Sequence, residues 1–169
     1  MRSSYYYSIQ VFYLARAACT EIVNLMEVIA DQGIDLNQKN KFGLTAPCRS
    51  IAWSKSRSVD FPLRRGVVYT GDVERDSDGR TLLHHAALNP SLEIIRVLIA
   101  AKLEGGDPYI VDQSCFKAED YLCRVEKITE GSVAAFRHFL LDVQARFQGG
   151  IERADNEGED EFVNAPKFL

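Results

Sequence analysis

The sequence lacks the run of about 20 apolar residues that a membrane-spanning helix needs, so we expect no membrane span. It also lacks an excess of positive charge, because the formal net charge is −4 at pH 7. The one concentrated basic stretch, Lys55 to Arg65, is short and interrupted by Asp60. Nucleic-acid-binding proteins usually carry a basic face or stripe. We therefore expect no nucleic-acid partner.

Cysteine is scarce, and its spacing is unlike that of a metal site. Cys19, Cys48, Cys115 and Cys123 show none of the close pairs that are typical of zinc ligands, and a chain of this length needs no disulfide framework. We interpret all four as reduced thiols of a cytoplasmic or nuclear protein. The sequence also lacks a phosphate-binding glycine loop and a nucleophile motif such as G-x-S-x-G. We therefore predict no catalytic residue, no metal and no cofactor.

A repeat of 36 residues runs through the chain. The stretches 40–45, 76–81 and 112–117 each begin with Asn or Asp and follow one another by 36 positions. Asp35 and Asp107, each close behind a glycine, lie five residues before the first and the third stretch. Because the match recurs at both ends of the unit, it indicates an internal repeat rather than a chance motif.

Within the unit from 76 to 111, the sequence predicts a turn, a helix, a second turn and a second helix. Asp76 and Gly79 favour the first turn. Thr81 is placed to cap a helix over 82–88, and a second helix begins at Leu92. Neither helix is long enough to be stable alone, so stability must come from stacking on the neighbouring units.

These residues resemble the ankyrin repeat. The stretch from Asp76 to Ala87 is similar to the family pattern D-x-x-G-x-T-P-L-H-x-A-A, and Leu92 to Ile99 resembles the second helix of the family. The resemblance implies an all-α ankyrin-repeat solenoid of about four units, with short β-hairpin turns and a C-terminal capping helix. It also implies that His84, the histidine of the pattern, hydrogen-bonds back to the turn and has a structural role.

We predict an ankyrin-repeat domain over 1–148 and an acidic, disordered tail over 149–169. The units and the cap helix of the domain are expected at about 7–39, 40–75, 76–111, 112–129 and 131–147. The second unit departs from the family pattern because Pro62 falls inside its second helix. A proline there opposes a regular helix, so we expect a short, distorted one from about Ser56 to Arg65.

The N-terminus allows two interpretations. Apolar residues from Tyr5 to Leu14, followed by small residues, have some features of a secretory signal peptide. However, Ser8 and Gln10 interrupt the apolar run. When the repeat is carried backward, Phe12 to Val23 becomes a degenerate inner helix in which Ala17 and Ala18 take the paired-alanine positions of the family. We favour this second interpretation.

The resemblance implies a non-catalytic function in protein recognition, as an adaptor or an inhibitor that binds another protein as a monomer. In this family the turns and the inner helices form a concave binding face. The residues of this sequence that map onto that face are Lys41, Phe42, Arg49, Trp53, Ser77, Asp78, Arg80, His85 and Asn89. Two alternatives stay open: a substrate-recruiting or regulatory subunit of an enzyme system, and a host-directed effector.

Three of these residues are expected to form the energetic centre of the face, namely Arg49, Trp53 and Arg80. Tryptophan and arginine are enriched among the residues that dominate binding energy at interfaces. For Trp53 a second interpretation also stands, in which its ring packs beneath the segment 55–65 and belongs to the core.

Overall fold

The computed structural model describes residues 2–65, 75–101, 106–125 and 129–163, and their side chains over 9–65, 75–101, 106–125 and 129–149. These residues form helices joined by turns, and no strand occurs among them. In chain order the helices are α1 (Arg2–Thr20), α2 (Val23–Asp31), α3 (Ala46–Ala52), α4 (Ser56–Arg64), α5 (Leu82–Leu88), α6 (Leu92–Ala100), α7 (Ala118–Tyr121) and α8 (Glu130–Val163).

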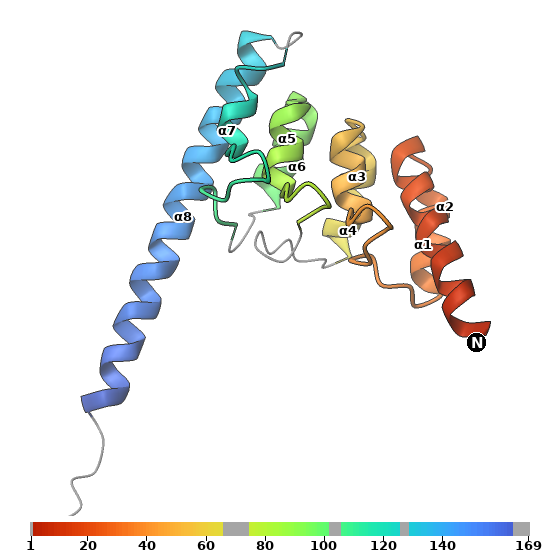
Figure 1. Cartoon of the computed structure of the whole chain (residues 1–169), viewed down its shortest axis with the longest axis horizontal. Helices are drawn as coiled ribbons and strands as arrows, with labels where there is room; N and C mark the ends of the chain where they lie inside the picture. Colours follow the sequence, from red (N-terminus) through yellow and green to blue (C-terminus); the bar gives the residue numbers. More distant parts are fainter. Residues whose placement is uncertain (1, 66–74, 102–105, 126–128, 164–169) are drawn as a thin grey trace, which may run out of the picture.

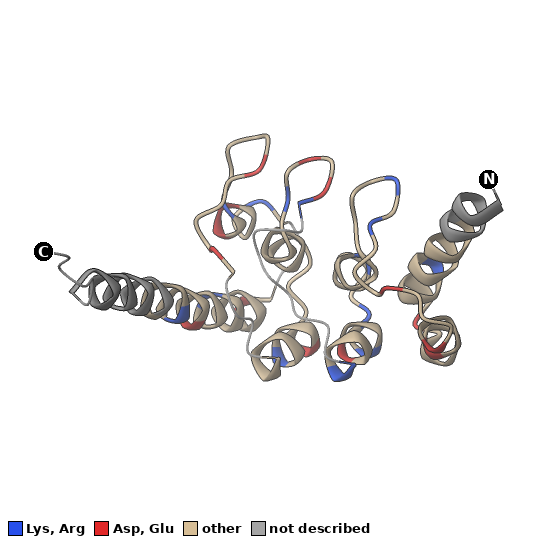
Figure 2. Ribbon diagram, turned by 90° about the horizontal axis from the view of Figure 1, so that it is seen from below, with Lys and Arg blue, Asp and Glu red and all other residues tan. Residues whose placement is uncertain are grey.

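The helices stack in two layers (Figure 1). Helices α1, α3, α5 and α7 are neighbours in the inner layer, and α4, α6 and α8 are neighbours in the outer layer, with α2 beside α4. Viewed from below, the turns before α3, α5 and α7 project from the side of the inner layer (Figure 2). Each inner helix is thus followed by an outer helix, which confirms the predicted all-α solenoid of ankyrin-like units.

The three projecting turns share one hydrogen-bonding pattern. Each begins with an Asn or Asp whose Oδ1 accepts bonds from the backbone N–H groups two and four residues later, at 2.8 to 3.1 Å. These first residues are Asn40, Asp76 and Asp112, which are 36 residues apart. The 36-residue spacing in the sequence is therefore the spacing of identical side-chain-capped turns.

Successive turns are joined by backbone hydrogen bonds. The N–H of Ser77 donates to the carbonyl of Phe42 at 3.0 Å, and the N–H of Gln113 donates to the carbonyl of Asp78 at 2.9 Å. This close approach explains Gly79, whose φ is +77° and where an added Cβ would lie 3.2 Å from the backbone N of Gln113. The turns therefore form one connected edge rather than three independent loops.

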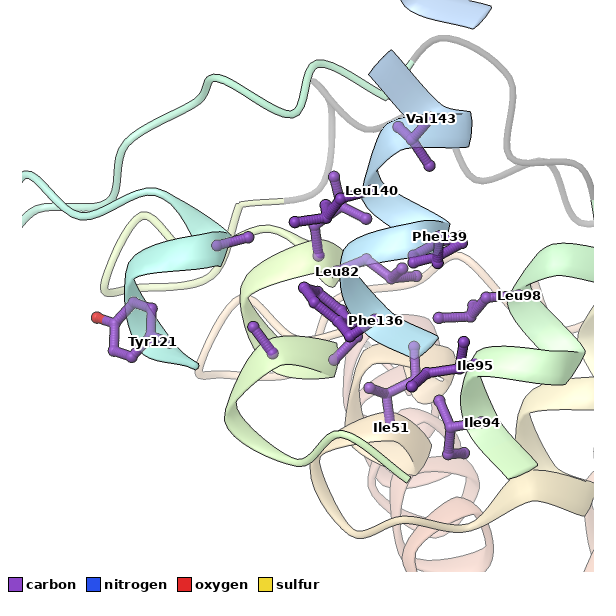
Figure 3. Close-up of a cluster of buried hydrophobic side chains, with 14 of the residues drawn as sticks. Ile51, Leu82, Ile94, Ile95, Leu98, Tyr121, Phe136, Phe139, Leu140 and Val143 are labelled. Carbon is purple, nitrogen blue, oxygen red and sulfur yellow. The ribbon is translucent and has the colours of Figure 1, made fainter. Parts of the chain in front are cut away.

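The larger core cluster joins the helices from α3 to α8 (Figure 3). Phe136 and Phe139 of α8 are 0% and 1% exposed, and they pack in this cluster with Leu82 of α5 and Leu98 of α6. Since α7 is the inner helix of the last unit and α8 packs against α6, α8 takes the position of an outer helix. It covers the end of the array in the way predicted for the cap helix.

Helix α8 is longer than the predicted cap helix. We expected the helix to end at 147 and the tail from 149 to be disordered, whereas α8 continues through Gly149 and Gly150 to Val163. A glycine inside a helix is unfavourable by only about 1 kcal/mol relative to alanine. No proline occurs between Gly150 and Pro166, and the pair of glycines does not stop the helix. Residues 164–169 lie outside the described part.

The first unit has its helices near the predicted places but with different bounds. Helix α1 begins at Arg2, well before Phe12, and ends at Thr20, because Glu21 adopts a left-handed conformation with φ of 59°. Ala17 and Ala18 are buried in the smaller core cluster with α2 and α3 side chains. These alanines are core residues, as the repeat interpretation of the N-terminus predicted.

The second helix of the second unit also forms where it was expected. Helix α4 ends at Arg64 with Pro62 inside it. Proline has no N–H to donate to the carbonyl of Ser58, one turn earlier. The proline ring is buried beside Phe61, and the apolar area that it buries offsets this loss. The helix ends within two residues of the proline.

Candidate binding groove

A groove lies between α1, the turn before α3, and α3 itself; we call it the α1–α3 groove. Its volume is about 640 Å³. Three of the predicted partner-binding residues line it, namely Lys41, Phe42 and Arg49. The turn and the inner helix of the second unit thus bring three of the predicted residues together, and their role in binding stays a prediction.

The opposite side of the groove was not predicted. Its residues on α1 are Val11, Phe12, Ala15 and Arg16. In the turn before α3, Gln38, Lys39 and Asn40 also line the groove and were missed. Phe12 and Arg16 are four residues apart and thus lie on one face of α1. That spacing is visible in the sequence, but the residues assigned to the binding face began at Lys41 and left this helix out.

Trp53 is exposed. Its accessible fraction is 58%, and it is the C-cap residue of α3, immediately before Ser54, whose φ of 53° is left-handed. The sharp change of direction at Ser54 carries the chain toward α4 while the indole stays in solvent. The interpretation in which Trp53 packs in the core beneath 55–65 is therefore wrong.

Three further predicted residues are also exposed on the turns and helix ends of the third unit. Ser77 and Asp78 lie at the tip of the turn before α5, and Asn89 is the C-cap residue of α5. The structure leaves them accessible to a partner, yet they do not line the α1–α3 groove. They stay predicted binding residues.

His85 does not lie on an open surface. It is 6% exposed, and its Nε2 is 2.9 Å from Oδ2 of Asp76. Asp76 is the residue that caps the turn, so His85 joins the inner helix to that turn. The sequence mapping failed here because the side chain points at its own turn rather than into the concave face, and His85 cannot contact a partner without leaving this pocket.

Arg80 is likewise held within the protein. Its guanidinium bonds to Asp78 at 3.0 Å, lies 3.6 Å from the buried carboxylate of Asp112, and covers the ring of Tyr121 with its Cζ 5.5 Å from the centroid. Asp112 and Tyr121 belong to the next unit. The structure gives Arg80 a role in joining two units. That it is also an energetic centre for binding stays a prediction.

His84 has the structural role that the resemblance implied. The backbone N–H of Thr81 donates to Nδ1 of His84 at 3.1 Å. Nδ1 is therefore the acceptor, and Nε2–H donates to the carbonyl of Phe116 in the next turn at 3.0 Å. His84 thus caps its own helix and ties it to the following unit.

Burial sets the protonation of these buried groups. It lowers the pKa of His85 below its ordinary value, and the nearby Asp76 carboxylate offsets this only in part. Burial also lowers the pKa of His84, against the opposing hydrogen bond to Phe116. For Asp112 burial acts in the opposite direction, but hydrogen bonds from Tyr121 and from backbone N–H groups leave its pKa below the ordinary value. Both histidines are thus neutral and Asp112 is ionised at neutral pH.

Charge is distributed unevenly over the turns (Figure 2). The turn before α3 carries Lys39 and Lys41, whereas the turns before α5 and α7 carry aspartates, among which Asp78 is exposed. The basic turn is the one that lines the α1–α3 groove. The turn of the second unit is therefore basic, whereas the turn before α5 carries Arg75 and Arg80 as well as its two aspartates, and Arg80 is paired with Asp78.

The described residues contain no group of three or more His, Cys, Asp or Glu side chains that could hold a metal ion. Within the same part of the chain, no helix is both long and apolar enough to cross a membrane. The four cysteines are free thiols, of which Cys48 is buried and Cys115 and Cys123 are exposed.

The fold defines the class of this protein as a solenoid of stacked helix pairs with projecting turns. Residues 78–108 match the family model of the ankyrin repeat, and this match confirms the resemblance that the third unit showed. No curated protein matches the sequence. Ankyrin repeats are typically non-catalytic modules for protein–protein interaction, and at this level the match supports a binding function.

Proposed function

We propose that this chain is a non-catalytic protein-recognition module, an adaptor or an inhibitor, that binds a partner protein as a monomer through its concave face. The face comprises the α1–α3 groove, Trp53, and the exposed residues Ser77, Asp78 and Asn89. The free thiols of all four cysteines fit a reducing compartment, the cytoplasm or the nucleus.

The observation that carries this proposal is the exposure of two large aromatic side chains at the turn and inner helix of one unit. Phe42 is 49% exposed at the turn before α3, and Trp53 is 58% exposed at the end of α3. Phe42 lines the α1–α3 groove, whose lining along α1 is largely apolar, and Trp53 lies at the C-terminal end of α3, the helix that contributes Arg49 to the groove. Apolar surface that is gathered in this way and rimmed by polar residues marks interaction sites in soluble proteins.

The frame beneath these side chains is ordered before any partner binds. The turns are fixed by the Oδ1 acceptors of Asn40 and Asp76, and they are joined by the Ser77 to Phe42 backbone bond. A preorganised surface loses little conformational entropy on association. The buried histidines contribute to this frame, which supports a structural rather than a catalytic interpretation of both.

Affinity purification with the full chain tests the proposal. Trp53→Ala should abolish the co-purification of specific partner proteins, since an indole at the centre of an interface typically contributes 2 kcal/mol or more, about a thirtyfold loss in affinity. The matched control is Leu141→Ala on α8, which removes another exposed apolar side chain, 62% accessible, from the outer layer. Equal retention of all partners by the two variants, with unchanged melting curves, would refute a concave binding face.

A further inference from the structure

The α1–α3 groove combines basic and apolar side chains. Its basic residues are Arg16, Lys39, Lys41 and Arg49, and its large apolar residues are Val11, Phe12 and Phe42. No acidic side chain is among the residues that line it. This composition favours a ligand that carries negative charge next to an apolar group.

Arg49 is the residue that makes this groove specific. It occupies the same position of its unit as His85 and Tyr121 do in theirs, 36 and 72 residues later. In those two units, the side chain hydrogen-bonds to the carboxylate of the aspartate nine residues earlier. The residue nine positions before Arg49 is Asn40, which has no carboxylate.

The amide of Asn40 does not replace the missing carboxylate. Its Oδ1 already accepts bonds from the backbone N–H groups of Phe42 and Leu44 at 2.8 and 3.1 Å. Nε of Arg49 is buried and has no hydrogen-bond partner among the described residues. A buried donor without an acceptor is unfavourable, and more so when it belongs to a charged group. An incoming carboxylate would pair with the part of the Arg49 guanidinium that lines the groove.

The apolar part of the groove lies beside this unmet donor. Phe12 is 60% and Phe42 is 49% exposed, and Nζ of Lys41 lies 4.9 Å from the centroid of the Phe42 ring. A volume near 640 Å³ falls within the range of about 300–1,000 Å³ that is typical of ligand pockets. The groove thus has room for the side chains of a few residues, with an apolar side chain between the two rings.

We infer that the α1–α3 groove binds a short acidic peptide segment of the partner protein, in which an Asp or Glu pairs with Arg49 and a neighbouring large apolar side chain packs against Phe12 and Phe42. The inference rests on the proposed function and names the chemistry of the partner.

A peptide is favoured over a single-stranded nucleic acid, because a phosphate backbone that continued along the concave face would meet the exposed carboxylate of Asp78 and a chain whose net charge is −4.

The test is a selection of random short peptides, displayed on phage, against the full-length chain. Enriched peptides are expected to carry Asp or Glu beside Phe, Leu or Trp. Their affinity, measured by fluorescence anisotropy with the labelled peptide, should fall about tenfold or more in Arg49→Met. Arg96→Met, which changes an exposed arginine on the outer helix α6, is the matched control and should leave affinity unchanged.

Two further variants keep the test decisive. Because Nε of Arg49 is unpaired, Arg49→Met should fold with an unchanged or higher melting temperature; if it fails to fold, the exposed Lys41→Glu serves in its place and should weaken binding similarly. Arg49→Glu places a like charge against the acidic residue of the peptide and should weaken binding of the enriched peptides at least as much as Arg49→Met does.

The inference would be overturned if the selection enriched no peptides, or only peptides without acidic residues. It would also be overturned if the affinity of the enriched peptides were the same for the parent protein, Arg49→Met and Lys41→Glu. A labelled single-stranded oligonucleotide that binds with dependence on Arg49 when no peptide does would overturn it as well. The proposed function has its own test: it fails if Trp53→Ala captures the same partner proteins as the parent chain, whatever the peptide selection gives.

Discussion

Replacing Phe136 by alanine tests whether α8 closes the repeat array. The ring is 0% exposed, and it packs with Phe139 in the cluster that joins α3 to α8. Removing a fully buried phenylalanine destabilises a protein by about 3–5 kcal/mol, since burial of the ring is lost and a cavity remains. For a chain of this length each kcal/mol lowers the melting temperature by about 2–4 °C. We therefore expect Phe136→Ala to melt roughly 6–20 °C below the parent protein.

Urea unfolding followed by far-UV circular dichroism measures this loss, because the described fold is helical. Leu141→Ala provides the control from the same helix: its side chain is 62% exposed, and its loss should change stability by no more than about 0.5 kcal/mol. If Phe136→Ala destabilises no more than Leu141→Ala, then α8 does not act as the outer helix of the last unit, and the packing described for the end of the array is wrong.

Three further perturbations address the turns and the buried polar groups. Gly79→Ala should destabilise the fold by about 1–2 kcal/mol, since it places a Cβ at φ +77° against the next turn. Cys115 stands in the equivalent turn position with φ 62°, so Cys115→Gly should stabilise the fold by up to about 1 kcal/mol. The denaturant midpoints of the two variants and the parent protein measure both effects. Arg80→Ala should lower the melting temperature by several degrees, and an unchanged value would contradict its role between units. Because burial lowers the pKa of His84 and His85, the unfolded chain binds more protons, so stability should be full above about pH 6.5 and fall as the pH drops below it. A melting temperature that rises on acidification from pH 7.5 to pH 5.5 would contradict that sign.

The parts of the fold that follow from local chemistry were predictable from the sequence. Helix α5 has the predicted bounds, Leu82–Leu88, because Thr81 and His84 cap it and Gly79 permits the turn before it. The end of α8 was not predicted, since Gly149 and Gly150 indicated a stop whereas the helix continues through both of them. Local signals of opposite sign cannot be ranked from their pattern alone.

The candidate site was predicted only in part, for a different reason. Sequence mapping assigned side chains to the concave face by their position in the unit; Phe42 and Trp53 are exposed, as a binding role requires, and that role stays a prediction. It was wrong for His85, because the choice between pointing into solvent and bonding to Asp76 depends on the distance between helix and turn. The nine-residue spacing between Asp76 and His85 can be read in the sequence. Only the structure shows that these two side chains form a hydrogen bond, and that Nε of Arg49, at the matching position of the second unit, has no partner among the described residues.

The most direct test of the central claim is hydrogen–deuterium exchange of the full chain with and without a captured partner. We predict that binding slows exchange in residues 38–53, which hold the turn before α3 and α3 itself, while the outer helices α4 and α6 stay unchanged. Protection confined to α4, α6 and α8, with none in 38–53, would contradict recognition through the concave face.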